Sequence, residues 1–264
     1  MFVDAHLHIY DLAKAFDFKN FSFETLKETY ICASSHKFLE FEFTKNFCLK
    51  NKLKAFYSFG LHPQNPTTDE LANLEKLLMK KEIHIIGETG FDLFNSSFEK
   101  TFKEQLEVWH IQIELAQKFN LPVLLHLRKA NHLIFENIKD LKKLPSVVFH
   151  SWSGSAVEAN CILKRGVNAY FSLGKALLRG QKNVVDIAKN FPLEYILTET
   201  DAPYMQLKDE VFSLPKDIIA VTKKIAALRT EDDFTKDKNT LSEKFLYEQL
   251  LPQVQKNFLQ IFKS

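Results

Sequence analysis

Short apolar runs alternate with amphipathic stretches along the whole chain. Eight runs of four to eight residues are almost continuously apolar, as is typical of parallel strands that are buried on both faces. These predicted strands are Phe2–Ile9, Tyr30–Ala33, Leu53–Gly60, Ile83–Gly87, Leu121–Leu127, Ser146–Phe149, Asn168–Leu173 and Tyr195–Thr198.

The segments between these runs have helical periodicity. In the longest one, apolar residues recur at three- and four-residue spacing from Phe98 to Ala116, which predicts one helix face against a core. The predicted helices are Thr68–Lys81, Ser97–Asn120, Asn131–Lys143, Ala156–Arg165 and Gly180–Asn190. A helical tail is expected from about Asp217 to Phe262, with breaks near Thr235–Asn239 and at Pro252.

About eight strand–helix repeats in 264 residues predict a closed (β/α)8 TIM barrel. We expect residues 1–264 to form a single barrel domain, with its active site at the C-terminal ends of the strands. An open doubly wound sheet is the structural alternative. Its nucleotide-binding versions are disfavoured, because no GxGxxG follows the first strand and no Walker A sequence is present.

Composition narrows the function classes without selecting one. With 45% hydrophobic and 26% charged residues, the chain is an ordinary globular protein rather than a disordered or fibrous one. A net charge of +2 gives no overall attraction to nucleic acid or membranes, although a local basic groove stays open. The three cysteines are far apart, which argues against a disulfide framework or a thiolate zinc site. No signal peptide or membrane span is recognisable, so we expect a cytoplasmic protein.

Most of the chemically informative residues follow or end the predicted strands. They are His6, His8, Glu88, His126, His150 and Asp201. All strand C-termini of a barrel converge on one face, so these residues are expected to share one pocket. Four histidines and two carboxylates buried together would be costly without a cation. The set therefore predicts a metal centre.

Each of these signals is weak when taken singly. The His6-x-His8 pair puts two imidazoles on one side of a strand. Two histidines that only pack in the core or lie on the surface would give the same pattern. Glu88 alone could cap a helix, and Asp201 alone could start a turn. His62 lies in a His-Pro turn and is expected to contact substrate rather than metal. The remaining histidines, His36, His84, His110 and His132, are expected to be structural or surface residues.

Several motifs together resemble one known family. They are Asp4–His8, Gly60–Pro63, Ile86–Asp92, Leu121–Ala130, Phe149–Gly154, Glu199–Tyr204 and, less specifically, Asn257–Phe262. In this set and order, the sequence resembles the TatD family of metal-dependent deoxyribonucleases, within the amidohydrolase-type barrels. The resemblance implies two divalent ions, Mg, Mn or Zn. His6, His8, Glu88 and Asp201 would hold the first ion, and Glu88, His126 and His150 the second, with Glu88 bridging.

The activity implied is phosphodiester hydrolysis by a metal-activated water, of the 3′–5′ exonuclease type, with Asp201 and Glu88 as catalytic residues. The expected partner is DNA, single-stranded or a 3′ end, without a membrane or an obligate protein partner. Arg128 lies two residues past His126 and is a candidate phosphate clamp, or else a salt bridge at the barrel rim. Trp152 and Tyr204 could stack bases, or else form an apolar pocket wall.

The chain departs from the family after Asp201. An Arg-Asn-x-Pro element is usual there, whereas Gln206–Pro215 contains neither arginine nor asparagine. If that element grips nucleic acid, this chain binds DNA weakly or prefers another substrate. Two other hypotheses therefore stay open. One is a two-metal hydrolase of a small amide or ester or of an aminoacyl-tRNA, and the other is a non-catalytic binding protein on a retained barrel. A basic groove would favour the nuclease, and a small closed cavity the carbonyl hydrolase.

Overall fold

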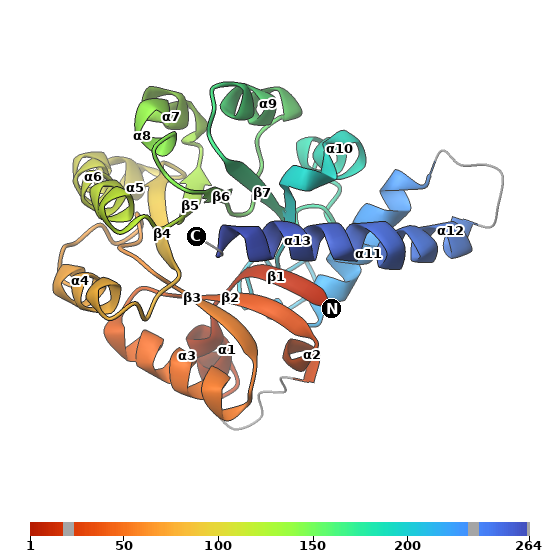
Figure 1. The fold of residues 1–264 in the computed structure, drawn as a ribbon, viewed down its shortest axis with the longest axis horizontal. Helices are drawn as coiled ribbons and strands as arrows, with labels where there is room; N and C mark the ends of the chain where they lie inside the picture. The colour runs from red at the N-terminus through yellow and green to blue at the C-terminus, as the bar shows by residue number, and fades with distance from the viewer. Residues whose placement is uncertain (18–23, 232–237, 263–264) are drawn as a thin grey trace.

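The computed structural model describes residues 1–17, 24–231 and 238–262. Eight parallel strands form one sheet in sequential order, and β1 also contacts β8, so the sheet curls into a nearly closed barrel (Figure 1). The strands are β1 (Phe2–Leu7), β2 (Thr29–Ser35), β3 (Lys54–Phe59), β4 (Ile85–Asp92), β5 (Val123–Arg128), β6 (Val147–Phe149), β7 (Ala169–Leu173) and β8 (Ile196–Thr198). The predicted (β/α)8 barrel is confirmed.

Helices surround the strands on the outside of the barrel, as Figure 1 shows. They are α1 (Ile9–Ala15), α2 (Glu24–Lys27), α3 (Phe38–Lys50), α4 (Leu71–Met79), α5 (Ser96–Glu99), α6 (Phe102–Phe119), α7 (Asn131–Glu136), α8 (Ile138–Leu141), α9 (Ala156–Lys164), α10 (Lys182–Asn190), α11 (Asp217–Arg229), α12 (Lys238–Phe245) and α13 (Leu251–Ile261). A 3₁₀ turn (Leu193–Tyr195) precedes β8, and a π-helical turn (Leu246–Leu250) joins α12 to α13. Within the described ranges, no helix is both long and apolar enough to cross a membrane.

Several predicted boundaries need correction. Strand β4 continues to Asp92, so Glu88 lies within it rather than at its end. Helix α3 was not predicted, because apolar residues occur on all its sides and Leu39 and Leu49 are exposed. The break expected at Pro252 is wrong. This proline lies in the first turn of α13, where a missing N–H costs least, directly after the wider π turn. The break near Thr235–Asn239 falls largely outside the described residues.

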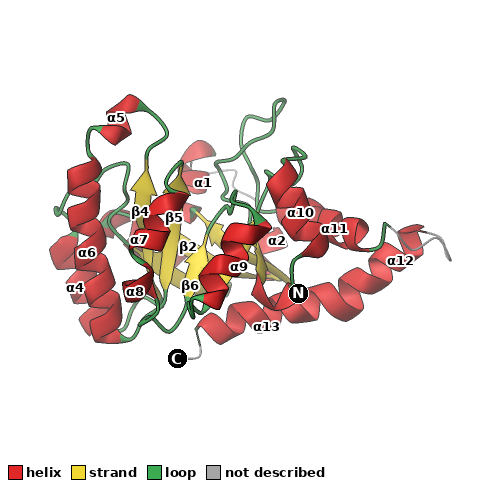
Figure 2. Ribbon diagram, turned by 90° about the horizontal axis from the view of Figure 1, so that it is seen from above, coloured by secondary structure: helices red, strands yellow, loops and turns green. Residues whose placement is uncertain are grey.

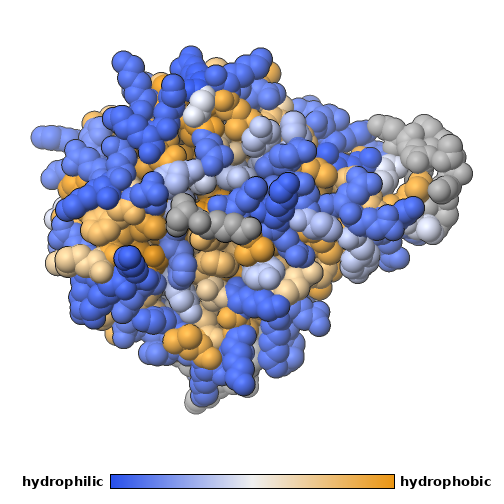
Figure 3. Space-filling model, in the orientation of Figure 1, coloured by the Kyte–Doolittle hydropathy of each residue, from blue (hydrophilic) through white to orange (hydrophobic). Residues whose placement is uncertain are grey.

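Helix α13 covers the N-terminal end of the barrel. It contacts β1 and β8, and it runs beneath the strands in Figure 2. The buried Phe258 ring packs against Phe56 at a centroid distance of 5.4 Å. Asn257 Nδ2 donates to the carbonyls of Leu193 and Ile196, at 2.7 Å and 2.8 Å. Figure 3 shows that hydrophilic side chains dominate this face of the molecule. The sealed end leaves the opposite mouth of the barrel for chemistry.

The buried carboxylate of Asp4 joins β1 to the segment after β8. It accepts hydrogen bonds from the backbone N–H and the hydroxyl of Thr200, at 2.9 Å and 2.6 Å. One residue further on, the Asp201 N–H donates to the carbonyl of His6 at 2.9 Å. The seam of the barrel is therefore closed by a side chain, and this closure places Asp201 beside His6.

The Asn257→Ala variant is expected to lose on the order of 2 kcal/mol of unfolding free energy, because one buried and one partly buried carbonyl lose their donor. Urea unfolding curves measure the loss. Asn190→Ala is the matched control, since the exposed Asn190 side chain bonds only to Asp186 among the described residues and should change stability little. Equal stability of the two variants would contradict a structural role for Asn257.

Candidate metal centre

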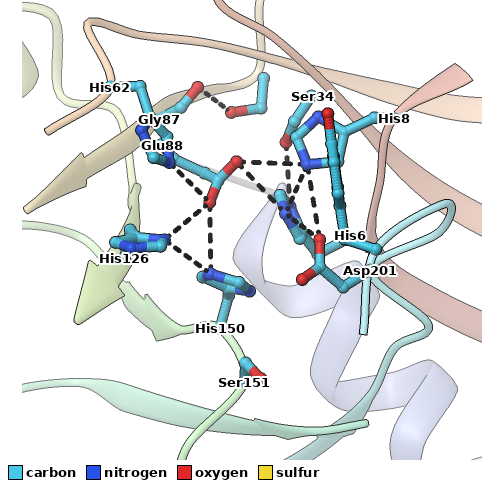
Figure 4. A network of polar contacts seen from close by, with 12 residues as sticks. His6, His8, Ser34, His62, Gly87, Glu88, His126, His150, Ser151 and Asp201 are labelled. Atoms are coloured by element: carbon cyan, nitrogen blue, oxygen red, sulfur yellow. Dashed lines mark hydrogen bonds and ion pairs between the residues drawn. The ribbon is translucent and has the colours of Figure 1, made fainter. Parts of the chain in front are cut away.

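Six imidazoles and two carboxylates meet at the C-terminal mouth of the barrel, where Figure 4 shows most of them pointing toward one another. They are His6, His8, His36, His62, His126, His150, Glu88 and Asp201. All of them except His6 line a cavity of about 650 Å³. Strand ends that are far apart in sequence thus contribute to one site, as the positional argument predicts.

Glu88 lies at the centre of the cluster and is 2% exposed. Its Oε2 atom is 3.3 Å from Nε2 of both His6 and His8, and 3.2 Å from Nε2 of His36. The other oxygen, Oε1, faces a second group of imidazoles. It lies 3.6 Å from His62 Nε2, 3.3 Å from His126 Nδ1 and 3.2 Å from His150 Nε2. A carboxylate with this arrangement has the geometry to bridge two cations.

A bulge in β4 presents the Glu88 side chain. Gly87 pairs with Leu124 and Thr89 pairs with the next residue, Leu125, so Glu88 is the extra residue without a partner. Bulges of this kind re-aim a side chain next to a functional site. Gly90 lets β4 approach β5 closely, because a Cβ at this position would lie 2.2 Å from the carbonyl oxygen of His126. Its φ of +136° also favours glycine.

Asp201 completes the group around His6 and His8. Its Oδ1 atom is 3.3 Å from Nε2 of His6 and 3.5 Å from Nε2 of His8. The residue adopts a left-handed backbone conformation with φ of 55°, which aspartate tolerates better than most residues. Local strain of this kind persists only where the surrounding structure enforces it.

Outer oxygens orient several of these rings. Asp92 Oδ2 is 3.0 Å from Nε2 of His126, and because a carboxylate only accepts, Nε2 carries a hydrogen, whereas Nδ1 faces Glu88 with room for either a proton or a metal ion between them. Glu199 Oε1 lies 3.5 Å from Nδ1 of His150, on the far side of that ring from Glu88. The Asp92–His126 hydrogen bond is the outer partner typical of metal-binding histidines. Nδ1 of His150 has no hydrogen-bond partner among the described residues, so Glu199 lies close to this ring without bonding to it.

Without metal ions, the positive charge that balances the buried carboxylates comes from protons on the neighbouring imidazoles. Burial disfavours the charged form of Glu88, but the surrounding imidazoles, with His6 foremost, hold its pKa well below its usual range. Burial also opposes charging of His6, yet Glu88 and Asp201 raise the pKa of His6 well above its usual value. Against the same burial cost, hydrogen bonds to Asp92 and Glu88 raise the pKa of His126 to about 9. The carboxylates therefore demand positive charge between themselves and the rings.

The donor set fits divalent metal ions. Imidazole nitrogens and carboxylate oxygens suit Zn²⁺, Mn²⁺ and similar ions. Four groups of three residues have donor atoms within 4.8 Å of one another. They are His6–His8–Asp201, His6–Glu88–His150, His8–His36–Glu88 and His62–Glu88–His126. Every residue predicted from the sequence as a metal ligand belongs to at least one of these groups.

His36 was assigned a structural or surface role from the sequence, and that prediction is wrong. Its side chain lines the cavity and contacts Glu88 directly. The signal that could have found it is its position immediately after β2. The predicted strand ended at Ala33, whereas β2 extends to Ser35, and the early end hid the strand-end position of His36.

The predicted substrate-contact residues have different surroundings. His62, Arg128 and Tyr204 line the cavity, and the Tyr204 residue is 48% exposed. Trp152 is only 3% exposed, and its ring packs against Phe149 and Phe171. The prediction of an exposed stacking face at Trp152 is therefore wrong. The alternative of an apolar wall describes it, because the turn after β6 directs this residue into the core, where its backbone N–H donates to the carbonyl of Ser172.

A family profile matches almost the whole chain, and known proteins resemble large parts of it. The profile of the family described as TatD related DNase matches residues 3–263. An uncharacterized metal-dependent hydrolase of Methanocaldococcus jannaschii is 29% identical over 232 residues, which cover 86% of this chain and 89% of that protein. The 3′-5′ ssDNA/RNA exonuclease TatD of Cronobacter turicensis is 34% identical over 177 residues, which cover 65% of this chain and 62% of the exonuclease.

A solved structure supports the fold independently. The crystal structure of a TatD homologue from Escherichia coli superposes with a TM-score of 0.77 at 22% sequence identity. The match covers 100% of this chain and 98% of that homologue. At this identity, the likeness speaks for the barrel and its topology.

Adding Mn²⁺ or Zn²⁺ is expected to raise the Tm of the wild-type protein by several degrees, because an ion that binds only the folded state stabilises it. The Glu88→Gln variant should lose most of this rise, since a neutral amide cannot compensate two cations. Glu114→Gln on the exposed face of α6 is the control, and it should respond like the wild type. Scanning calorimetry with and without metal measures both shifts. An undiminished rise in Glu88→Gln would exclude Glu88 as the central ligand.

Proposed function

This chain belongs to the family of TatD related DNases, and from that membership we propose that it is a 3′–5′ exonuclease of single-stranded nucleic acid. The family is one of metal-dependent hydrolases, and the exonuclease of Cronobacter turicensis carries this activity in its name. The observation that carries the proposal is the bridging geometry of Glu88, whose two oxygens face separate groups of imidazoles.

The proposed centre holds two divalent ions. His6, His8, Glu88 and Asp201 would bind the first, and Glu88, His126 and His150 the second. When bound, such a pair supplies activation of water and stabilisation of charge on the phosphoryl oxygens. The identity of the ions, Mg, Mn or Zn, is part of the proposal.

The protein's own groups orient the reactants. Asp201 has a more exposed side chain than Glu88, 12% against 3%, and lines the cavity. Its Oδ1 atom faces His6 and His8, which leaves Oδ2 to position the attacking water and accept its proton.

His62 is suited to donate a hydrogen bond to the substrate. Its Nδ1 atom accepts a hydrogen bond from the Gln64 N–H at 3.1 Å, so the hydrogen of the neutral ring lies on Nε2. Burial lowers the pKa of His62 to about 3 despite the nearby Glu88 carboxylate, and the ring is therefore neutral. An Nε2–H that points into the cavity would bind a phosphoryl oxygen.

Two exposed aromatic side chains define a path for a single strand. Among the large exposed apolar side chains of the described residues, only Phe94 and Tyr204 line the cavity, and each is 48% exposed. They follow β4 and β8, which are four strands apart and hence on opposite sides of the barrel mouth. Exposed rings of this kind stack bases with little sequence preference.

One arginine packs against the Phe94 ring, and another bonds to the backbone that follows Tyr204. The guanidinium of Arg128 lies 4.0 Å from the centre of the Phe94 ring. Beyond Tyr204, Arg179 Nη2 donates to the carbonyls of Met205 and Gln206, at 2.9 Å and 3.0 Å. Both arginines line the cavity and are suited to bind phosphates on either side of the metal centre. Arg179 would thereby supply the guanidinium that the segment after Asp201 lacks.

Single-stranded oligonucleotides labelled at the 5′ end test the proposal. With Mg²⁺ or Mn²⁺, we expect a ladder of progressively shorter labelled products, and a chelator should abolish it. Asp201→Asn is expected to slow the reaction at least ~100-fold, because it removes both a ligand and the proton acceptor. Asp186→Asn, an exposed substitution on α10, is the control.

Absence of shortening by a preparation with measured bound metal would contradict the nuclease function. Hydrolysis of a carboxylic ester, an amide or an aminoacyl-tRNA by that same preparation would then favour the carbonyl hydrolase. If no substrate is cleaved, the remaining hypothesis is a binding protein on a retained barrel.

Phe94→Ala is expected to raise the KM for single-stranded DNA about ten-fold, because base stacking on one aromatic ring contributes ~1–3 kcal/mol. The kcat should change less, since the Phe94 ring packs against Arg128 rather than against Glu88 or Asp201. Tyr247→Ala, which removes an exposed ring on the π turn far from the cavity, should leave the KM unchanged.

Abasic substrates sharpen this test. An abasic residue at the stacked position removes the same interaction, so Phe94→Ala and wild type should then have equal KM values. If the variant's disadvantage persists with an abasic residue at every position, Phe94 acts by holding Arg128 rather than by stacking a base.

A further inference from the structure

His36 has the ring orientation of a metal ligand. Its Nδ1 atom lies 3.2 Å from the carbonyl oxygen of Gly60. A carbonyl only accepts hydrogen bonds, so a ring that donates to Gly60 carries its hydrogen on Nδ1, and the lone pair of the neutral ring is then on Nε2. Nε2 is 3.2 Å from Oε2 of Glu88. A lone pair that faces a carboxylate oxygen is unfavourable unless a proton or a metal ion lies between them.

The same pattern occurs at the predicted ligand His126. One of its ring nitrogens faces the outer oxygen of Asp92, while the other faces Oε1 of Glu88. Histidines that bind metals in proteins almost always donate their second N–H to a carboxylate, a carbonyl or water. His62 has the opposite orientation, since its Nδ1 accepts a backbone hydrogen bond and its Nε2–H points at Glu88.

The backbone around His36 is held from two sides. The His36 N–H and the Lys37 N–H both donate to Oε2 of Glu40, at 3.0 Å and 3.1 Å, and Glu40 lies in the first turn of α3. On the other side, the ring bonds to the segment after β3 through the Gly60 carbonyl. The ring is therefore positioned by the scaffold, as a metal ligand needs to be.

We propose that His36 is an additional metal ligand of this chain, binding through Nε2 on the same side of Glu88 as His8. These three residues form one of the donor groups whose atoms lie within 4.8 Å of one another. The proposal rests on the metal-dependent function proposed above. It assigns His36 a role that the sequence motifs do not contain, and it separates His36 from His62, whose ring contacts the same carboxylate with the opposite nitrogen protonated.

Titration of the metal-free protein with Co²⁺ tests the assignment, because the visible absorption band of bound Co²⁺ depends on the number and type of its ligands. Equilibrium dialysis of the same samples gives the affinity. The His36→Ala variant is expected to bind at least one Co²⁺ about ten-fold or more weakly, and its absorption band should change. His62→Ala is the matched control from the same cavity, and its Co²⁺ affinity and band should equal those of the wild type.

Wild-type affinity and an unchanged band in His36→Ala would overturn the assignment, since His36 would then be only a hydrogen-bonding partner of Glu88. Equal weakening in His36→Ala and His62→Ala would also overturn it, because the loss would not depend on ring orientation. Thermal unfolding of the metal-free variants checks that they fold. If His36→Ala does not fold, the His36→Phe variant replaces it, because phenylalanine retains an aromatic ring but has no nitrogen that could bind metal. Failure of the wild type itself to bind Co²⁺ would instead contradict the proposed metal-dependent function.

Discussion

The buried carboxylate of Glu88 is the constraint around which the mouth of the barrel is organised. An ionised carboxylate out of contact with water is very costly unless positive charge surrounds it. Six imidazoles surround it, three on each oxygen, and all of them except His62 can provide that charge or a lone pair that holds a cation. One of these rings, that of His126, is in turn oriented by the outer carboxylate of Asp92. In this site the imidazoles compensate the charge of the central carboxylate, and an outer carboxylate in turn compensates the charge of the imidazoles.

The barrel makes this arrangement feasible because it separates stability from chemistry. Apolar side chains of the strands and α13 close the N-terminal end, and the seam between β1 and β8 is held by the Asp4 side chain and by backbone hydrogen bonds, not by the side chains of the site residues. The functional groups are attached to strand ends and bulges that this frame positions. A scaffold that is stable without the site tolerates strained features such as the left-handed Asp201.

The sequence predicted the strands and the six principal metal-binding candidates because both depend on periodicity. A strand buried on two faces is continuously apolar, and the polar residue that ends it stands out, as His126 and His150 do. Residues beyond the end of a strand follow no regular hydrophobic pattern, so their positions are not predicted by periodicity. His36 was missed because two further residues of β2 separate it from the apolar run, and the buried Trp152 was misplaced because its direction depends on the turn after β6. Helix α3 and the continuous helix through Pro252 escaped for a related reason, since tertiary packing there outweighs local pattern.

The distinction between ligands and substrate contacts at this mouth depends on hydrogen positions rather than on distance. His36 and His62 both contact Glu88, at 3.2 Å and 3.6 Å, and their rings lie 4.8 Å apart. Their outer partners differ, a carbonyl that accepts for His36 and an N–H that donates for His62. One ring therefore turns a lone pair inward and the other an N–H. A lone pair attracts a cation, whereas an N–H attracts an anionic oxygen, so neighbouring histidines on one carboxylate are prepared for opposite charges. A site that must hold metal ions and a phosphate together needs both orientations.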